Sequence, residues 1–66
     1  MAITNNLKAI RTERCLLQED LANAAGACSR TIGRIERNER NASLELALRI
    51  AKYLQIPVEE IFQLDQ

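Results

Sequence analysis

The chain has no histidine, and its two cysteines, Cys15 and Cys28, do not form a CxxC pair. Histidine and cysteine are the usual zinc ligands, so we expect no zinc site and no other cofactor. The sequence also lacks a recognisable nucleophile–base pair, which argues against an enzyme. We expect two free thiols in a reducing cytoplasm, with an internal disulfide as the less favoured alternative.

Aromatic residues are scarce as well, since Tyr53 and Phe62 are the only two among 66 residues. The core must therefore be built from leucine, isoleucine and alanine, which suits closely packed helices. No apolar run approaches the ~20 residues that a membrane-spanning helix needs, and the N-terminus shows no signal-peptide pattern. We expect one small domain, residues 1–66, with no membrane partner and no small-molecule ligand.

Net charge is absent too, because nine basic and nine acidic side chains cancel. The bulk charge therefore favours no class of partner. The distribution is uneven: residues 30–40 carry four arginines and two glutamates, while residues 57–66 carry three acids and no base. A local basic patch is compatible with nucleic-acid binding, and equally with an ordinary solvated helix face.

Apolar spacing and capping residues predict an all-α fold of five helices. Asparagine at position 5 or 6 can cap the first helix, which ends near residue 14. The second and third helices cover residues 18–25 and 29–37. Gly26 lies between them, where a helix often ends with φ > 0.

Ser43 is a natural cap for the fourth helix, which ends near residue 54. Pro57 is expected to begin the fifth helix at its first position. The apolar face of that helix consists of Val58, Ile61 and Phe62. The two terminal segments, MAIT and FQLDQ, can form short extended stretches.

A short helix, a turn of about three residues with a glycine, and a second helix match the helix-turn-helix pattern. The stretch LLQEDLANAAGACSRTIGRIE, residues 16–36, resembles the Cro/C1-type helix-turn-helix family. The matching positions are Leu16, Gln18, Glu19, Leu21, Ala22, Gly26, Thr31, Ile32, Ile35 and Glu36. Flanking segments extend the resemblance over residues 5–62, and it is closest to compact stand-alone repressors. These repressors imply that the two terminal segments pair as a small sheet.

The resemblance implies a role in binding double-stranded DNA for residues 18–41. Residues implied to reach bases from the third helix are Ser29, Arg30 and Arg34. Residues implied to contact the DNA backbone are Gln18, Thr31, Arg37, Arg40 and Asn41. The family also implies a structural salt bridge between Arg11 and Glu36.

The chemistry of the arginines agrees with this role. Arg30, Arg34 and Arg37 are spaced i, i+4 and i+7, so they share one face of a helix. An arginine can donate two hydrogen bonds to a guanine edge, worth ~1–3 kcal/mol of discrimination. The alternative is that Arg30 and Arg34 only form a solvated helix face. Arg37 and Arg40 would then make weak surface ion pairs with Glu36 and Glu39.

The sequence departs from the family pattern at several positions. Leu17 and Cys28 stand where hydroxyl-bearing residues would cap the second and third helices. Gly33 lies inside the third helix, where it either permits a close approach to DNA or contributes nothing. Cys28 is near the expected DNA surface and is either an inert small residue or a redox-sensitive one, while Cys15 is expected to be partly buried.

The C-terminal half has more apolar side chains than a single small core needs. This excess predicts a two-fold dimer interface, formed by Leu46, Tyr53, Ile56 and Phe62. The predicted function is that of a homodimeric transcriptional repressor that reads a palindromic operator. The alternative is a protein-interaction module, such as an antitoxin or corepressor, that binds its partner through the last two helices.

Overall fold

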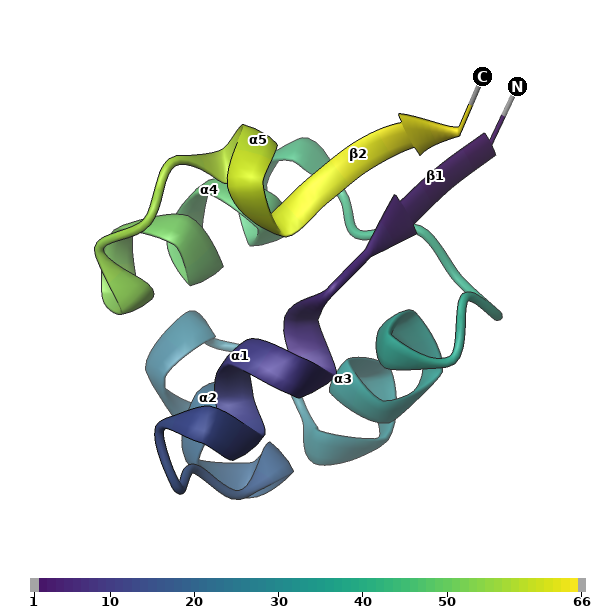
Figure 1. Ribbon diagram of the computed structural model, residues 1–66. Helices are drawn as coiled ribbons and strands as arrows, with labels where there is room; N and C mark the ends of the chain where they lie inside the picture. The colour runs from purple at the N-terminus through teal and green to yellow at the C-terminus, as the bar shows by residue number, and fades with distance from the viewer. Residues whose placement is uncertain (1, 66) are drawn as a thin grey trace.

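The computed structural model describes residues 2–65, which form five helices and two short strands. In chain order these are β1 (Ala2–Asn5), α1 (Leu7–Glu13), α2 (Gln18–Ala25), α3 (Ser29–Glu36), α4 (Leu44–Leu54), α5 (Val58–Ile61) and β2 (Phe62–Asp65). The strands lie side by side and project away from the helices (Figure 1). The predicted fold of five helices with a small terminal sheet is confirmed.

The core is aliphatic, and every helix contributes to it. Its largest fully buried side chains are Leu7, Leu21, Ile32, Ile35, Ile50, Leu54 and Ile61. Burying each such side chain stabilises the fold by ~1.5–3 kcal/mol relative to leaving it exposed. Ala22 and Ala25 are also buried, and their small side chains let α2 pack closely against α3 and α4.

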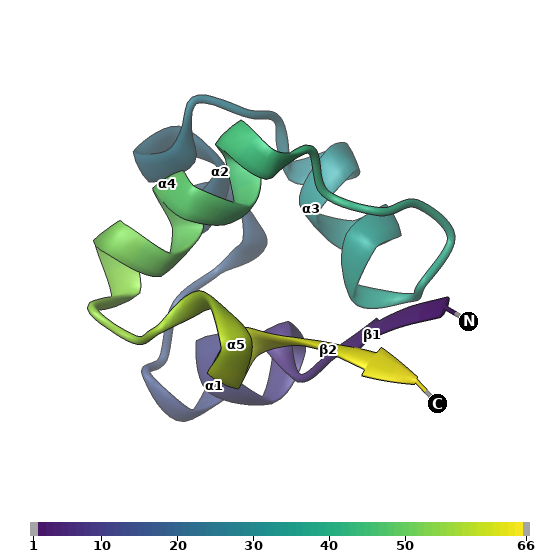
Figure 2. The same cartoon turned by 90° about the horizontal axis from the view of Figure 1, so that it is seen from above.

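The turn between α2 and α3 depends on Gly26. This residue has φ +72°, the left-handed conformation that glycine adopts without steric cost. The Ala27 N–H donates to the Ala22 carbonyl at 2.8 Å and closes the end of α2. Figure 2 shows the two helices joined by this turn, with α4 lying beside α2. The α2 boundaries match the prediction, and α3 ends one residue earlier than expected.

The two strands pair antiparallel, with Ile3 opposite Leu64 and Asn5 opposite Phe62. Asn5 fixes this sheet to the helices. Its Oδ1 accepts a hydrogen bond from the Leu7 N–H at 3.1 Å, and its Nδ2 donates to the Ile35 carbonyl at 2.9 Å. Asn5 therefore links β1 to the start of α1 and to the last turn of α3.

The helix starts have the caps that their side chains can supply. Ser43 caps α4 as predicted, because its Oγ accepts a hydrogen bond from the Leu46 N–H at 3.1 Å. Leu17 cannot cap α2, but the Asp20 carboxylate accepts from the Leu17 N–H at 2.9 Å. That contact is half of a capping box and partly replaces the missing cap.

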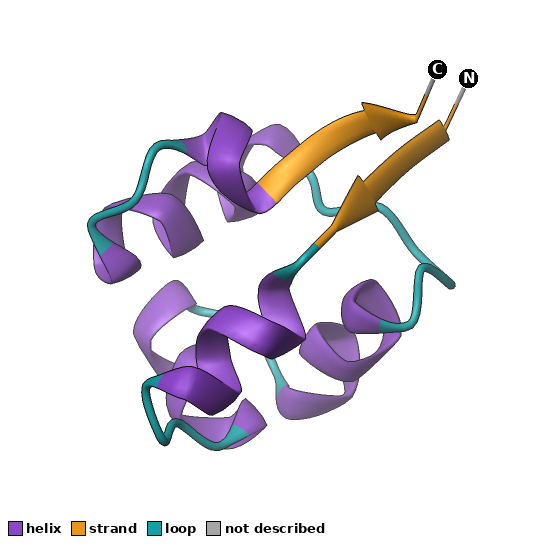
Figure 3. Ribbon diagram, viewed as in Figure 1, coloured by secondary structure: helices purple, strands orange, loops and turns teal. Residues whose placement is uncertain are grey.

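The fifth helix is shorter than predicted at both ends. Pro57 has ψ 141° and precedes α5 as its N-cap, so it is not the first helical residue. Phe62 does not continue the helix, because its pairing with Asn5 draws it into β2. The loop of residues 37–43 is the longest connection within residues 2–65 (Figure 3). No helix in this part of the chain is long and apolar enough to cross a bilayer.

Candidate nucleic-acid interface

The outer face of α3 presents two arginines. Ile32 and Ile35 are buried and attach the helix to the core, whereas Arg30 and Arg34 point away from it and are exposed. Neither guanidinium has an ion pair or hydrogen bond to any residue between positions 2 and 65. Ser29 is exposed at the start of the same helix. The outer face therefore offers unpaired hydrogen-bond donors to the acceptor groups of a ligand.

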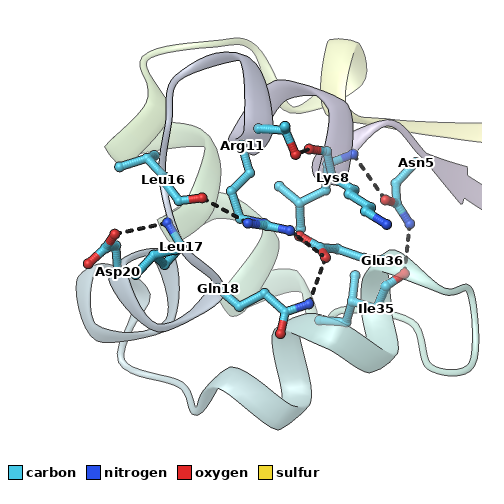
Figure 4. A network of polar contacts seen from close by, with 11 residues as sticks. Asn5, Lys8, Arg11, Leu16, Leu17, Gln18, Asp20, Ile35 and Glu36 are labelled. Carbon is cyan, nitrogen blue, oxygen red and sulfur yellow. Dashed lines mark hydrogen bonds and ion pairs between the residues drawn. The ribbon is translucent and has the colours of Figure 1, made fainter.

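A buried ionic network holds α3 in place (Figure 4). Arg11 Nε lies 2.6 Å from Glu36 Oε2, and Arg11 Nη2 donates to Glu36 Oε1 at 3.3 Å. Only 12% of the Arg11 side chain and 2% of the Glu36 side chain are exposed. Arg11 Nη1 also donates to the Leu16 carbonyl at 2.8 Å. The pair therefore connects α1, the start of α2 and the end of α3.

Gln18 belongs to the same network. Its Nε2 donates to Glu36 Oε1 at 3.0 Å, so the amide at the start of α2 has a fixed orientation. The carbonyl oxygen of that amide makes no hydrogen bond within residues 2–65, and the side chain is half-buried. Gln18 is therefore positioned by protein contacts before any ligand arrives, which reduces the entropy cost of binding.

Gly33 is buried within α3, beneath the side chains of Gln18 and Arg37. A Cβ at this position would lie 3.2 Å from Gln18 Nε2 and 3.2 Å from Arg37 Nη1. The missing side chain instead leaves room for the Gln18 amide and for Arg37. These two polar groups therefore lie next to each other over the surface of α3.

Arg37 follows α3 as its C-cap and is paired with a neighbour in the loop. Its Nε lies 2.9 Å from Glu39 Oε2, and both side chains are about half exposed. The hydrogen bond and charge of Arg37 hold the pKa of Glu39 below its ordinary value, and Glu39 raises the pKa of Arg37. Arg40 and Asn41 follow in the same loop and are exposed.

Cys28 precedes α3 but makes no capping hydrogen bond with its side chain. Its Sγ lies 3.2 Å from the Oγ1 of Thr31, and this hydrogen bond lowers the pKa of the Cys28 thiol. Thr31 is half-buried at the edge of the interface. Cys15 is exposed with φ +59°, so the prediction that it is partly buried is wrong: it follows the last turn of α1 instead of packing inside it.

The residues predicted to form a dimer interface are only partly accessible. Leu46, Ile56 and Phe62 pack against the core of their own chain, and Tyr53 is 45% exposed. The other exposed large apolar side chains of α4 and the sheet are Ile3, Leu44, Leu48 and Leu64. Two of them, Ile3 and Leu44, line an apolar groove of about 250 Å³ together with Val58 and Phe62. We call this surface the apolar face.

Comparison with known proteins agrees with this geometry. A model of the helix-turn-helix family matches residues 7–61, which include all five helices. The chain belongs to the Cro/C1-type helix-turn-helix family. It is thus a DNA-binding transcriptional regulator of the helix-turn-helix type and not an enzyme.

Individual relatives support the same assignment. An HTH-type transcriptional regulator of Methanocaldococcus jannaschii is 43% identical over 58 residues, 88% of each chain. The restriction-modification controller protein C.AhdI from Aeromonas hydrophila is 39% identical, with a TM-score of 0.77 over 82% of each chain. A DNA-binding protein structure from Bacteroides fragilis has a TM-score of 0.82 at 23% identity, covering 92% of this chain and 98% of that one; this likeness shows the fold alone.

Proposed function

We propose that the protein binds a specific double-stranded DNA sequence with α3 in the major groove. The observation that carries this proposal is the contrast between the two faces of α3. Its inner face is fixed by buried isoleucines and by Glu36, while its outer face presents Arg30 and Arg34, which have no polar partner among residues 2–65. A rigid helix with unsatisfied guanidinium groups suits the reading of base edges.

The remaining polar residues suit contacts that position the helix on the DNA. Gln18 and Arg37 lie together at one end of α3, and Arg40 and Asn41 are exposed in the loop that follows it. Ser29, at the start of α3, suits a base contact beside Arg30, whereas Thr31 suits a backbone contact like those of the loop residues. Contacts of this kind go to phosphates and carry no sequence information themselves, but they fix the register of the base-reading side chains.

We further propose that the chain acts in the cytoplasm as a homodimeric repressor of the compact stand-alone kind. The apolar face is its self-association surface, with Phe62 in the groove and Tyr53 at the exposed end of α4. Two copies related by a two-fold axis would place their recognition helices ~34 Å apart, one turn of DNA. The operator would then be a palindrome.

The base-reading role is tested with Arg30→Ala on single-base variants of a bound operator. The wild type should discriminate at one position by ~1–3 kcal/mol, and the variant should lose discrimination at that position only. Arg34→Ala should affect a different position. If Arg30→Ala keeps the wild-type ranking of operator variants, the assignment of Arg30 as a base-reading residue fails.

A further inference from the structure

We propose that Arg49, on α4, forms a second backbone-phosphate site together with Arg40, beside the turn between α2 and α3. Arg49 had no role predicted from the sequence. This inference rests on the proposed DNA-binding function and adds a contact to it. Its ligand is a phosphate of the DNA strand that lies across the groove from Gln18.

The site is a hollow of about 350 Å³ between the α2–α3 turn and the start of α4. Its polar lining consists of Thr31, Arg40, Ser43, Glu45 and Arg49. Two guanidinium groups and two hydroxyl groups thus face one small space, against a single carboxylate. Arginine suits phosphate here because its planar group donates parallel hydrogen bonds to two oxygens.

The side chain of Arg49 is directed toward the turn. Its Nη1 lies 3.2 Å from the point where a Cβ on Gly26 would stand, so the guanidinium rests against the glycine. Its Nε and Nη2 bind Glu45 Oε2 at 3.0 and 2.7 Å. Nη1 takes no part in that ion pair and has no hydrogen-bond partner within residues 2–65. It is therefore available to a ligand in the hollow.

The position of the hollow indicates DNA as the source of the phosphate. Thr31 of α3 lines it, so a strand bordering the groove that α3 enters would pass this hollow. Gln18 and Arg37 lie together over Gly33, and neither of them lines this hollow. The major groove is ~12 Å wide, so a helix inside it can be held from both bordering strands. Arg49 and Arg40 would supply the contact to the strand opposite Gln18.

Glu45 competes with the phosphate for Arg49. The Glu45 and Arg49 side chains are 73% and 56% exposed, so their pairing is weak and a phosphate can replace it. Removing the acid should therefore strengthen DNA binding, and removing the arginine should weaken it. Opposite effects from two partners of one ion pair are not expected from a change in fold stability.

The test measures the dissociation constant of Arg49→Gln on a bound duplex at several salt concentrations. Lys52→Gln, one turn further along α4, is the matched control because it removes the same charge from an exposed site. Arg49→Gln should weaken binding about fivefold and flatten the log–log salt dependence by ~0.9, the value for one lost phosphate contact. Glu45→Gln should tighten binding, and Lys52→Gln should stay close to wild type. Thermal unfolding checks that each variant is folded.

The outcomes separate this inference from the proposed function. If the wild type binds a specific duplex and Arg49→Gln behaves like Lys52→Gln, the phosphate site is overturned and the DNA-binding function stands. If Arg49→Gln and Glu45→Gln weaken binding alike, the site is overturned as well. If the folded wild type binds no duplex, the proposed function and this inference fail together.

Discussion

Among single residues, Glu36 links the fold to the candidate site. Its carboxylate is 2% exposed and accepts hydrogen bonds from Arg11 and Gln18. The resemblance implied the pair with Arg11, but the spacing of these residues did not. The link to Gln18 depends on how α2 and α3 pack, which no local pattern in the sequence reveals.

Glu36→Ala should therefore destabilise the fold strongly. Breaking a buried ion pair leaves the other charge unpaired, which costs about 3 kcal/mol. Urea unfolding should show this loss, while Glu59→Ala on α5, an exposed acid, should change the free energy of unfolding by less than about 0.5 kcal/mol. Equal effects from the two substitutions would contradict the structural role of Glu36.

Replacing Glu39 should have a favourable effect, and on DNA binding instead of on fold stability. Its carboxylate forms an ion pair with Arg37, which we propose contacts the DNA backbone. Glu39→Gln frees that guanidinium and removes a negative charge from the interface, so affinity should rise about threefold. Fluorescence anisotropy on a bound duplex measures the change, with Glu60→Gln on α5 as the charge-matched control. A loss of affinity, or equal gains from both variants, would argue against this role of Arg37.

Cys28 should be the more reactive of the two thiols. Both cysteines are exposed, but the hydrogen bond from Thr31 lowers the pKa of Cys28, so more of it is thiolate at neutral pH. Iodoacetamide should therefore alkylate Cys28 faster than Cys15, as followed by peptide mass spectrometry. Thr31→Val removes the hydrogen bond and should slow the alkylation of Cys28 without changing the alkylation rate of Cys15. Equal rates in the wild type would refute the effect of Thr31.

At the scale of elements, α3 is well packed but contains Gly33, a residue that is unfavourable inside a helix. Glycine inside a helix costs ~1 kcal/mol relative to alanine. Gly33→Ala should recover part of this free energy, because the new methyl group meets only the ends of flexible side chains. The same change should displace the Gln18 amide and weaken DNA binding several-fold. A variant with unchanged stability and unchanged affinity would show that Gly33 does not position Gln18.

The sequence predicted some elements well and others poorly, for physical reasons. The bounds of α2 were correct because an acidic first turn and Gly26 mark its ends locally. The pairing of β1 with β2 was implied by the family and not by periodicity, since the two strands are distant in sequence. Phe62 was placed in α5 because its spacing fits a helix, whereas the sheet determines its conformation. The exposed Cys15 and the position of Arg49 over Gly26 are tertiary features without a sequence signal.

At the scale of the whole molecule, the apolar face and the outer face of α3 are the two surfaces that we propose for self-association and for DNA binding. A domain of this size has a thin margin of stability, which a partner bound to the folded state increases. Leu44→Glu should disrupt self-association, because Leu44 is 76% exposed and lines the groove of the apolar face. Acidic residues are favoured in the first turn of a helix, so α4 should remain folded.

Sedimentation should therefore show a dimer for the wild type and a monomer for Leu44→Glu. Leu17→Glu, at the start of α2 and 65% exposed, is the control and should remain dimeric. A wild-type monomer that copurifies with another protein would favour the interaction-module alternative for this face.

The central claim is that α3 reads a DNA sequence as part of a symmetric dimer. The most direct test is selection of bound duplexes from a random pool at about 0.15 M salt, followed by sequencing. The account predicts enrichment of a palindrome with half-sites one helical turn apart, and loss of this enrichment in the Arg30→Ala/Arg34→Ala double variant. A folded wild-type protein that enriches no sequence, or a double variant that enriches the same palindrome, would contradict it.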